Sequence, residues 1–282
     1  MKKNIWAIVT AIAAAAALAA CGSGSSAQSS AAGSSAAASS EAASEAGSGA
    51  ASSAADASAA AGGTLIMATN AEFEPWEYHD GDKVVGIDAE IAEAIAKKLG
   101  MELKIEDMAF DAIIPAVTSG KADIGIAAIS VTEERKASVD FTDTYADSAL
   151  EILVKKDNTE ITGLDSLAGH KIGVQTGTTG DLKATDVVGD ENVERFNSYF
   201  EAIQSLKQGK LDAVLIDKAP AKVFLQQNDD LQKVGDDLDK EEYAIAVAKG
   251  NTELVDKLNN AISELKADGT FDEIMNKYIP AE

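Results

Sequence analysis

The amino-acid sequence contains three groups of residues whose types and spacing could bind a charged small molecule. The first is the run from Ile129 to Lys136, in which Thr132 is suited to cap a helix and Arg135 lies in the turn that follows. A guanidinium in this position can bind a carboxylate through two parallel hydrogen bonds. The spacing alone is equally consistent with an ordinary solvated helix start.

The second group is a glycine-rich loop, Gln175 to Asp181, which follows an apolar strand. Backbone N–H groups in such a loop, and at the start of the next helix, favour an anion. The loop lacks the lysine of a P-loop and the glycine spacing of a dinucleotide fingerprint. It therefore indicates a carboxylate rather than a nucleotide phosphate, unless it is a purely structural turn.

The third group is a single carboxylate, Asp217, directly after the apolar run Val214 to Ile216. A carboxylate at the end of a buried strand needs a partner, because an unpaired charge away from water is costly. Asp217 is suited to bind an ammonium group or to cap the following helix. Taken by itself, it favours the capping role.

Signals of catalysis are weak. The two histidines, His79 and His170, show no metal-ligand spacing, and no Gly-x-Ser-x-Gly sequence occurs. We expect no catalytic residue, no metal and no cofactor.

The three groups lie in an alternation of predicted strands and helices that is typical of an α/β fold. Apolar spacing predicts strands at 65–68, 103–105, 124–126, 171–175 and 213–216, and helices at 87–99, 111–119, 202–208, 252–267 and 271–278. Ligands of open α/β sheets bind at the carboxyl ends of strands. We therefore expect the segment from Ala127 to Ser130, together with Asp217, to border a cleft.

One stretch of the chain repeats. The pattern Ile-x-x-(Val/Leu)-x-x-Gly-Lys-x-Asp occurs at 114–123 and again at 203–212, a shift of 89 residues, and Phe110 falls on Tyr199 under the same shift. Each copy predicts a helix, a glycine stop and a buried strand. The period is too long for a solenoid and indicates two similar lobes.

The N-terminus predicts an exported, lipid-anchored protein. Lys2 and Lys3 precede an uncharged apolar run of about 16 residues, shorter than the roughly 20 that span a bilayer. The sequence Leu-Ala-Ala-Cys at 18–21 resembles a bacterial lipobox, and Cys21 is the only cysteine. We expect a signal peptide over 1–20 and lipid on Cys21; an ordinary secretory signal is the alternative.

The segment after the cysteine is almost wholly Ala, Ser and Gly, which predicts a disordered tether over 21–63. Its length favours a Gram-positive surface over a Gram-negative periplasm. The formal net charge of −23 argues against nucleic acid or anionic lipid as a partner. Contact with the membrane is therefore expected through the lipid anchor alone.

Several motifs resemble the polar amino-acid substrate-binding proteins of ABC importers. They are FEPWEY at 73–78, VGID at 85–88, IIPA at 113–116, GKAD at 120–123, TEERKASVDFT at 132–142, GVQTGTT at 173–179, DAVLID at 212–217 and GTF at 269–271. The resemblance implies a two-lobed, type II periplasmic-binding-protein-like fold, in which each lobe is a mostly parallel sheet flanked by helices. Two hinge strands would cross near 145–149 and 239–243, leaving 64–148 with 244–282 as lobe one and 149–243 as lobe two.

The resemblance also implies how the two charged ends of an amino acid are held. Arg135 would clamp the α-carboxylate, assisted by Ser130 and Thr179. Asp217 would bind the α-ammonium group, helped by the Ala128 carbonyl and the Ser130 hydroxyl.

The ligand side chain would lie between Phe73 and Phe110, with Asn70 and Gln175 at its polar end. The full ligand-binding set expected from the resemblance is Asn70, Phe73, Phe110, Ala128, Ser130, Arg135, Gln175, Thr178, Thr179 and Asp217.

The sequence departs from the family at the ligand's polar end. Asn70 stands where many members carry Asp, so a partner for a cationic side chain is lost. This slightly favours glutamine or cystine over arginine or lysine, although two aromatic faces also suit a cation. We expect a monomer that passes a free amino acid to a membrane permease with its ATPase. The alternatives are a dehydratase-type enzyme, or a sensor or adhesin, on the same fold.

Overall fold

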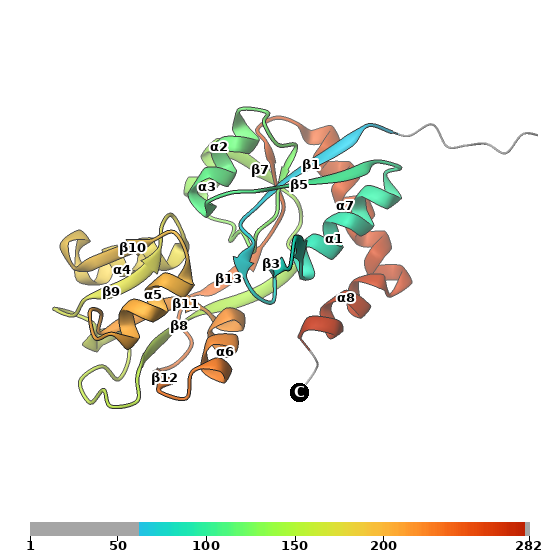
Figure 1. The fold of residues 1–282 in the computed structure, drawn as a ribbon. Helices are drawn as coiled ribbons and strands as arrows, with labels where there is room; N and C mark the ends of the chain where they lie inside the picture. The colour runs from blue at the N-terminus through green and yellow to red at the C-terminus, as the bar shows by residue number, and fades with distance from the viewer. Residues whose placement is uncertain (1–61, 280–282) are drawn as a thin grey trace, which may run out of the picture. The chain divides into compact units, whose positions relative to one another are not determined.

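The computed structural model describes residues 62–279 (Figure 1). The expected signal peptide, Cys21 and the expected tether as far as residue 61 lie outside the described residues. Within 62–279, no helix is both long enough and apolar enough to cross a membrane.

The first sheet has five strands in the order β5-β1-β6-β14-β7. Strand β1 (Thr64–Thr69) is parallel to β5 (Glu102–Asp107) and β6 (Ile124–Gly125). Strand β14 (Ala246–Ala248) is antiparallel to β6 and to β7 (Val139–Phe141). A strand from near the C-terminus therefore completes a sheet that begins at the start of the described chain.

Helices cover both faces of this sheet, because successive side chains of a strand point to opposite faces. On one face, α1 (Ile87–Lys98), α7 (Thr252–Asp268) and α8 (Thr270–Tyr278) pack in one cluster with Met67. On the other face, α2 (Ile113–Thr118) packs with Ala68. The short elements η1 (Phe110–Ala112) and α3 (Glu133–Ser138) lie next to α2.

A small antiparallel sheet follows β1. It consists of β2 (Glu72–Phe73), β3 (Glu77–Asp80) and β4 (Lys83–Val85). Phe73 pairs directly with Glu77 across β2 and β3, so their side chains lie on the same face.

The second sheet runs in the order β10-β9-β11-β8-β12, and β13 also pairs with β8. Its strands are β8 (Ala146–Lys155), β9 (Ile172–Gln175), β10 (Val193–Phe196), β11 (Ala213–Asp217), β12 (Leu231–Val234) and β13 (Lys240–Tyr243). Its longer helices are α4 (Thr179–Val188), α5 (Tyr199–Lys207) and α6 (Lys218–Gln227), and its short ones are η2 (Leu164–Ser166) and η3 (Asp190–Asn192). Helices α5 and α6 pack with Val214 and Ile216, whereas α4 packs with Leu215.

The chain passes between the sheets twice. It leaves the first sheet after β7 and enters the second through β8, then returns from β13 to β14. Strands β8 and β13 pair antiparallel, with Ala146 opposite Tyr243 and Ala149 opposite Lys240 (Figure 1). The fold is thus two-lobed, as expected, but its sheets are more mixed than expected. The reason is that β14 and β8 run antiparallel to both of their neighbours within the sheets.

The sequence repeat corresponds to a repeated local structure. In the first copy the Asp123 carboxylate accepts a hydrogen bond from the Ile66 N–H at 2.8 Å, and the Asp123 N–H donates to the Ile66 carbonyl at 2.9 Å. In the second copy Asp212 makes the same two contacts with Lys171, at 2.8 and 2.9 Å. Each copy therefore fixes the start of the next strand in its sheet, and the prediction of two similar units is confirmed.

Candidate ligand-binding site

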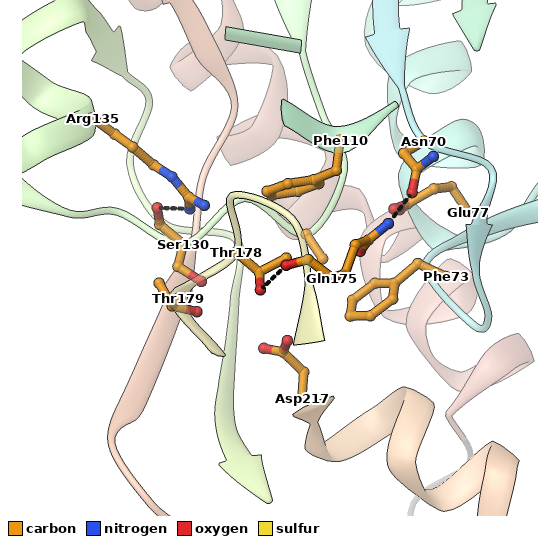
Figure 2. A pocket seen from close by; sticks show the side chains of 11 residues that line it. Asn70, Phe73, Glu77, Phe110, Ser130, Arg135, Gln175, Thr178, Thr179 and Asp217 are labelled. Atoms are coloured by element: carbon orange, nitrogen blue, oxygen red, sulfur yellow. Dashed lines mark hydrogen bonds between the residues drawn. The ribbon is translucent and has the colours of Figure 1, made fainter. Parts of the chain in front are cut away.

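A small cavity lies between elements of the two sheets. The residues that line it are Asn70, Phe73, Glu77, Phe110, Ala128, Ser130, Arg135, Gln175, Thr178, Thr179 and Asp217 (Figure 2). The structure thus brings all ten sequence-predicted positions together and adds one, Glu77.

Arg135 reaches the cavity from the first turn of α3. The Thr132 hydroxyl accepts the Arg135 N–H at 3.1 Å, so the predicted helix cap is confirmed. The guanidinium donates to the Ser130 carbonyl at 2.7 Å and to the Gly177 carbonyl at 3.0 Å, and it lies 5.3 Å from the Phe110 ring centroid. Burial lowers the pKa of Arg135. Within 62–279 no carboxylate lies in ion-pair distance, so the cavity holds a buried cation that can still accept an anion.

The glycine-rich loop connects β9 to α4. The Thr178 hydroxyl caps α4 by accepting the Asp181 N–H at 3.2 Å. The Asp181 carboxylate in turn accepts the Gly177 N–H at 3.0 Å and forms an ion pair with Arg195 at 2.9 Å. These contacts fix the loop, and with it the Gly177 carbonyl that receives Arg135.

Asp217 lies at the end of β11 and at the start of α6, but its side chain makes no capping hydrogen bond. It accepts instead from the Tyr243 hydroxyl at 2.5 Å. Burial raises the pKa of Asp217 to about 7, partly offset by the Tyr243 hydrogen bond. The capping role that the position alone favours is therefore wrong, and this carboxyl group faces the cavity without a neutralising cation.

At the other end of the cavity two side-chain amides join the lobes. The Gln175 amide nitrogen donates to the Asn70 side-chain oxygen at 2.8 Å and to the Asn197 carbonyl at 2.7 Å. The Asn70 amide nitrogen donates to the Met108 carbonyl at 2.9 Å. Phe73 lies beside them, with its ring 5.6 Å from that of Tyr199.

Ala128 adopts a positive φ of 45°, unusual for a residue other than glycine. Its N–H donates to the Asp88 carboxylate at 2.7 Å, and the Tyr145 hydroxyl donates to the same carboxylate at 2.9 Å. Asp88 is fully buried, so this contact holds the Ala128 backbone against the cavity.

Ser130 and Thr179 face a third acid. These two hydroxyls limit the rise in the Glu241 pKa that burial causes. Glu241 belongs to β13 and is mostly buried.

Glu77 is the lining residue that sequence reasoning missed. Its side chain is only 1% exposed, and burial next to Asp88 raises its pKa well above the ordinary value. In the sequence Glu77 is one of many acids in an acidic chain. Its pairing with Phe73 across a two-residue strand turns it inward, and so short a strand leaves no alternation to detect.

Within 62–279 no group of three or more His, Cys, Asp or Glu side chains is placed to hold a metal ion. The cavity instead presents a buried cation, Arg135, a buried acid, Asp217, and a polar far end to which Glu77 belongs. These groups are complementary to the two opposite charges of a zwitterionic ligand and to a polar group on its side chain.

Residues 65–281 match the family described as bacterial extracellular solute-binding proteins, family 3. The arginine-binding extracellular protein ArtP of Bacillus subtilis is 35% identical over 222 residues, which cover 77% of this chain and 87% of ArtP. An ancestral arginine-binding protein, solved bound to glutamine, is 44% identical with a TM-score of 0.74 and covers 77% of this chain and 98% of its own. An ancestral arginine-binding protein solved bound to arginine is also 44% identical, with a TM-score of 0.74, and covers 78% of this chain and 99% of its own.

Proposed function

The chain belongs to the bacterial extracellular solute-binding proteins of family 3, as an amino-acid-binding component of an ABC transporter, and from this premise we propose that it captures a free polar L-amino acid in the cavity between its lobes. It then delivers that amino acid to a membrane permease by closing around it. We infer no catalytic step, since the relatives are named for binding.

The observation that carries this proposal is the pair of opposite buried charges in one small cavity. Arg135 is 8% exposed and Asp217 is 5% exposed, and the hydrogen bonds of each within the protein leave its charge uncompensated. An α-carboxylate on the first and an α-ammonium on the second would satisfy both. Charge-assisted hydrogen bonds contribute roughly 1.5–3 kcal/mol each, so a few of them support micromolar or tighter binding, about −8 kcal/mol, after ordering costs.

The polar far end indicates a ligand whose side chain ends in hydrogen-bonding nitrogen or oxygen. Asn70 and Gln175 lie there with Glu77, and Phe73 and Phe110 offer aromatic faces for the intervening carbons. Glutamine and arginine, both bound by the ancestral relative, are the leading candidates. Cystine and lysine fit the same charge pattern less directly.

Closure would follow from the placement of the ligand-binding groups on both lobes. We propose lobe one as 64–148 with 244–282 and lobe two as 149–243, hinged where β8 and β13 pair. Arg135 and Ser130 then belong to lobe one, and Asp217 and Thr179 to lobe two. A ligand that bridges them favours the closed conformation by its differential affinity, which is what a permease can recognise.

A melting-temperature screen of the purified protein against the twenty amino acids and cystine tests the proposal. A ligand at about 100 times its Kd stabilises the folded form by about 2.7 kcal/mol, which raises the melting temperature of a domain this size by roughly 5–10 °C. We expect such a shift with arginine or glutamine. Melting temperatures that stay constant with every amino acid at millimolar concentration would contradict the function.

We further propose that Cys21 carries lipid and that the protein is held on a Gram-positive cell surface. The lipobox-like sequence and the tether before the family domain support this. Stable anchoring takes more than one acyl chain, so a multiply acylated cysteine is expected. Replacing Cys21 with Ala should move the protein from the membrane fraction to the soluble fraction, and a variant that stays with the membrane contradicts lipid attachment.

A further inference from the structure

Two buried carboxyl groups lie together behind the polar end of the cavity. Asp88 is 0% exposed and Glu77 is 1% exposed. Both Asp88 oxygens accept hydrogen bonds, from the Ala128 N–H at 2.7 Å and from the Tyr145 hydroxyl at 2.9 and 3.0 Å. Asp88 is therefore satisfied as an ionised acceptor within the first lobe.

Glu77 is not satisfied in this way. No N–H or O–H group of residues 62–279 donates a hydrogen bond to its Oε2 atom, although that atom is buried. The same side chain lines the cavity together with Asn70 and Gln175 (Figure 2). A buried carboxyl oxygen without a donor, at the wall of a ligand cavity, points to a donor on the ligand.

The neighbouring amides do not supply that donor in the structure. Both N–H groups of Gln175 are used, by the Asn70 oxygen and the Asn197 carbonyl, and one of the two Asn70 N–H groups is used by the Met108 carbonyl. With three of these four N–H groups used inside the protein, the polar end offers mainly oxygen acceptors. A guanidinium carries five N–H donors and no acceptor, whereas a side-chain amide or urea brings an oxygen that would need a donor of its own.

We propose that Glu77 is the residue that determines specificity at this site, and that it selects a ligand with a cationic, guanidinium-type side chain over a neutral one of the same shape. The inference rests on the proposed function and narrows it to one ligand class. It opposes the slight preference for a neutral ligand that Asn70 suggests, because the charge missing at Asn70 is supplied by Glu77.

The pair of acids, Glu77 and Asp88, also predicts that binding of a guanidinium ligand releases a proton. Burial raises the pKa of Glu77 well above its ordinary value, and Asp88, Asp107 and Asp217 raise it further, so the protonated form of Glu77 is favoured in the absence of a ligand. A guanidinium placed beside Glu77 lowers that pKa, and the proton leaves to solvent as the cation binds. The charge of the incoming guanidinium thus replaces the charge of the departing proton, and the net charge of the buried site is unchanged.

Titration calorimetry with arginine and citrulline tests the proposal, because citrulline has the shape of arginine with a neutral urea. We expect the wild-type protein to bind arginine at least tenfold more tightly than citrulline. In the Glu77→Gln variant the ratio of arginine affinity to citrulline affinity should fall at least tenfold. Its affinity for citrulline itself should change by less than about threefold. Glu72→Gln, an exposed change on the same hairpin, is the matched control and should behave as wild type.

Repeating the titrations in buffers of different ionisation enthalpy counts the protons released. Asp217 meets the α-ammonium of both ligands, so its proton release is common to both. We expect arginine to release more protons than citrulline from the wild-type protein, and the excess to vanish in Glu77→Gln.

Wild-type protein that binds citrulline as tightly as arginine would overturn the inference, and this comparison does not depend on whether any variant folds. An unchanged preference in a folded Glu77→Gln variant, or equal proton release by the two ligands, would overturn it as well. Binding of glutamine or citrulline without arginine would refute the inference alone. Failure of every amino acid and cystine in the melting-temperature screen would refute the proposed function itself.

Discussion

At the scale of single residues, the site is built from groups that the folded protein leaves electrostatically unsatisfied. Burial lowers the pKa of Arg135 and raises that of Asp217 to about 7. Each shift means that the charged form is disfavoured where it lies. A zwitterionic ligand relieves both at once, which couples binding to the stability of the protein.

Arg135→Lys tests the carboxylate clamp. Lysine keeps the charge but not the planar fork that contacts the Ser130 and Gly177 carbonyls. We expect the affinity for the amino acid to fall about 100-fold, or roughly 3 kcal/mol, as measured by titration calorimetry. Circular dichroism should show an unchanged fold, and an affinity within threefold of wild type would rule out the clamp.

Asp217→Asn tests the raised pKa. Between about pH 4 and pH 7 the folded protein holds a proton on Asp217 that the unfolded chain has already lost, so this group makes stability fall as the pH rises through that window. The variant lacks this loss. Relative to wild type without ligand, we expect it to gain about 1–3 kcal/mol of unfolding free energy between pH 5 and pH 8, while amino-acid binding is lost.

Thermal melts of both proteins across that pH range measure this effect. Parallel profiles from pH 5 to pH 8 would show that Asp217 does not titrate as its burial requires. Thermal melts of Glu72→Gln are the control, because this surface change should leave the dependence of stability on pH as it is in the wild-type protein.

Much of the residue-scale site could be predicted because its members sit at strand ends or in motifs with their own chemistry, as Arg135, Gln175 and Asp217 do. Two features could not. The first is the partner of Asp217. The sequence position of Asp217 favours a helix cap, whereas its hydrogen-bond donor is the Tyr243 hydroxyl of another strand. Glu77 lies within the FEPWEY motif, but the motif does not indicate which of its side chains point inward, and the pairing of Glu77 with Phe73 is visible only in the structure.

At the scale of elements, the loop that follows β6 carries backbone strain. Ala128 has a φ of 45°, and Asp88 holds its N–H from α1. A left-handed conformation costs a side-chain-bearing residue roughly 1–2 kcal/mol, whereas glycine adopts it readily at a smaller entropic cost. A hydrogen bond to Asp88, on a separate element, maintains this conformation, in which Ala128 lines the cavity.

Ala128→Gly should therefore stabilise the protein by about 0.5–1 kcal/mol. The neighbouring Ala127 has no positive φ and is buried, so Ala127→Gly should destabilise it by a similar or larger amount. If the backbone at Ala128 is strained, denaturant unfolding should show a higher free energy of unfolding than wild type for Ala128→Gly and a lower one for Ala127→Gly. A loss of stability in both would mean that the loop is relaxed.

Several elements were predictable, because apolar periodicity and glycine stops place the bounds of α1, α7 and β11 to within about one residue. Helix α5 begins three residues before its predicted start. The three-stranded sheet β2-β3-β4 was not, since its strands are two to four residues long. Its place at the cavity shows how a short hairpin can contribute binding groups that periodicity does not reveal.

At the scale of the whole molecule, one aromatic side chain lies where the two crossing segments meet. Trp76, from the loop between β2 and β3, has ring-centroid distances of 6.2 Å to Tyr145 and 5.0 Å to Tyr243. Tyr145 precedes β8, and Tyr243 ends β13. A change in the angle between the lobes would therefore alter the surroundings of this indole.

We expect saturating ligand to change the intensity or emission maximum of Trp76 fluorescence. The full sequence has a second tryptophan, Trp6, within the expected signal peptide, so a protein that retains this segment is measured in a Trp6→Phe background. The Arg135→Lys variant, whose affinity should fall about 100-fold, is the control and should give almost no change at a ligand concentration that just saturates the wild-type protein. Binding seen by calorimetry without any fluorescence change would argue against movement at the crossing strands.

Two similar lobes could be predicted from the 89-residue shift, because the repeat is a local pattern. The contacts between lobes could not be predicted from spacing. The hydrogen bonds from Arg135 to Gly177 and from Gln175 to Asn70 join residues 42 and 105 positions apart, and only the folded chain brings them together.

The position of β14 imposes an order on how the chain can acquire its structure. The strands of the second sheet lie consecutively between residues 146 and 243, so that lobe can complete itself as soon as this stretch is available. In the first sheet, β7 pairs only with β14, which also borders β6. As the chain emerges from its N-terminus onward, about a hundred further residues separate β7 from its partner β14. The sheet that begins first is therefore the last to be completed.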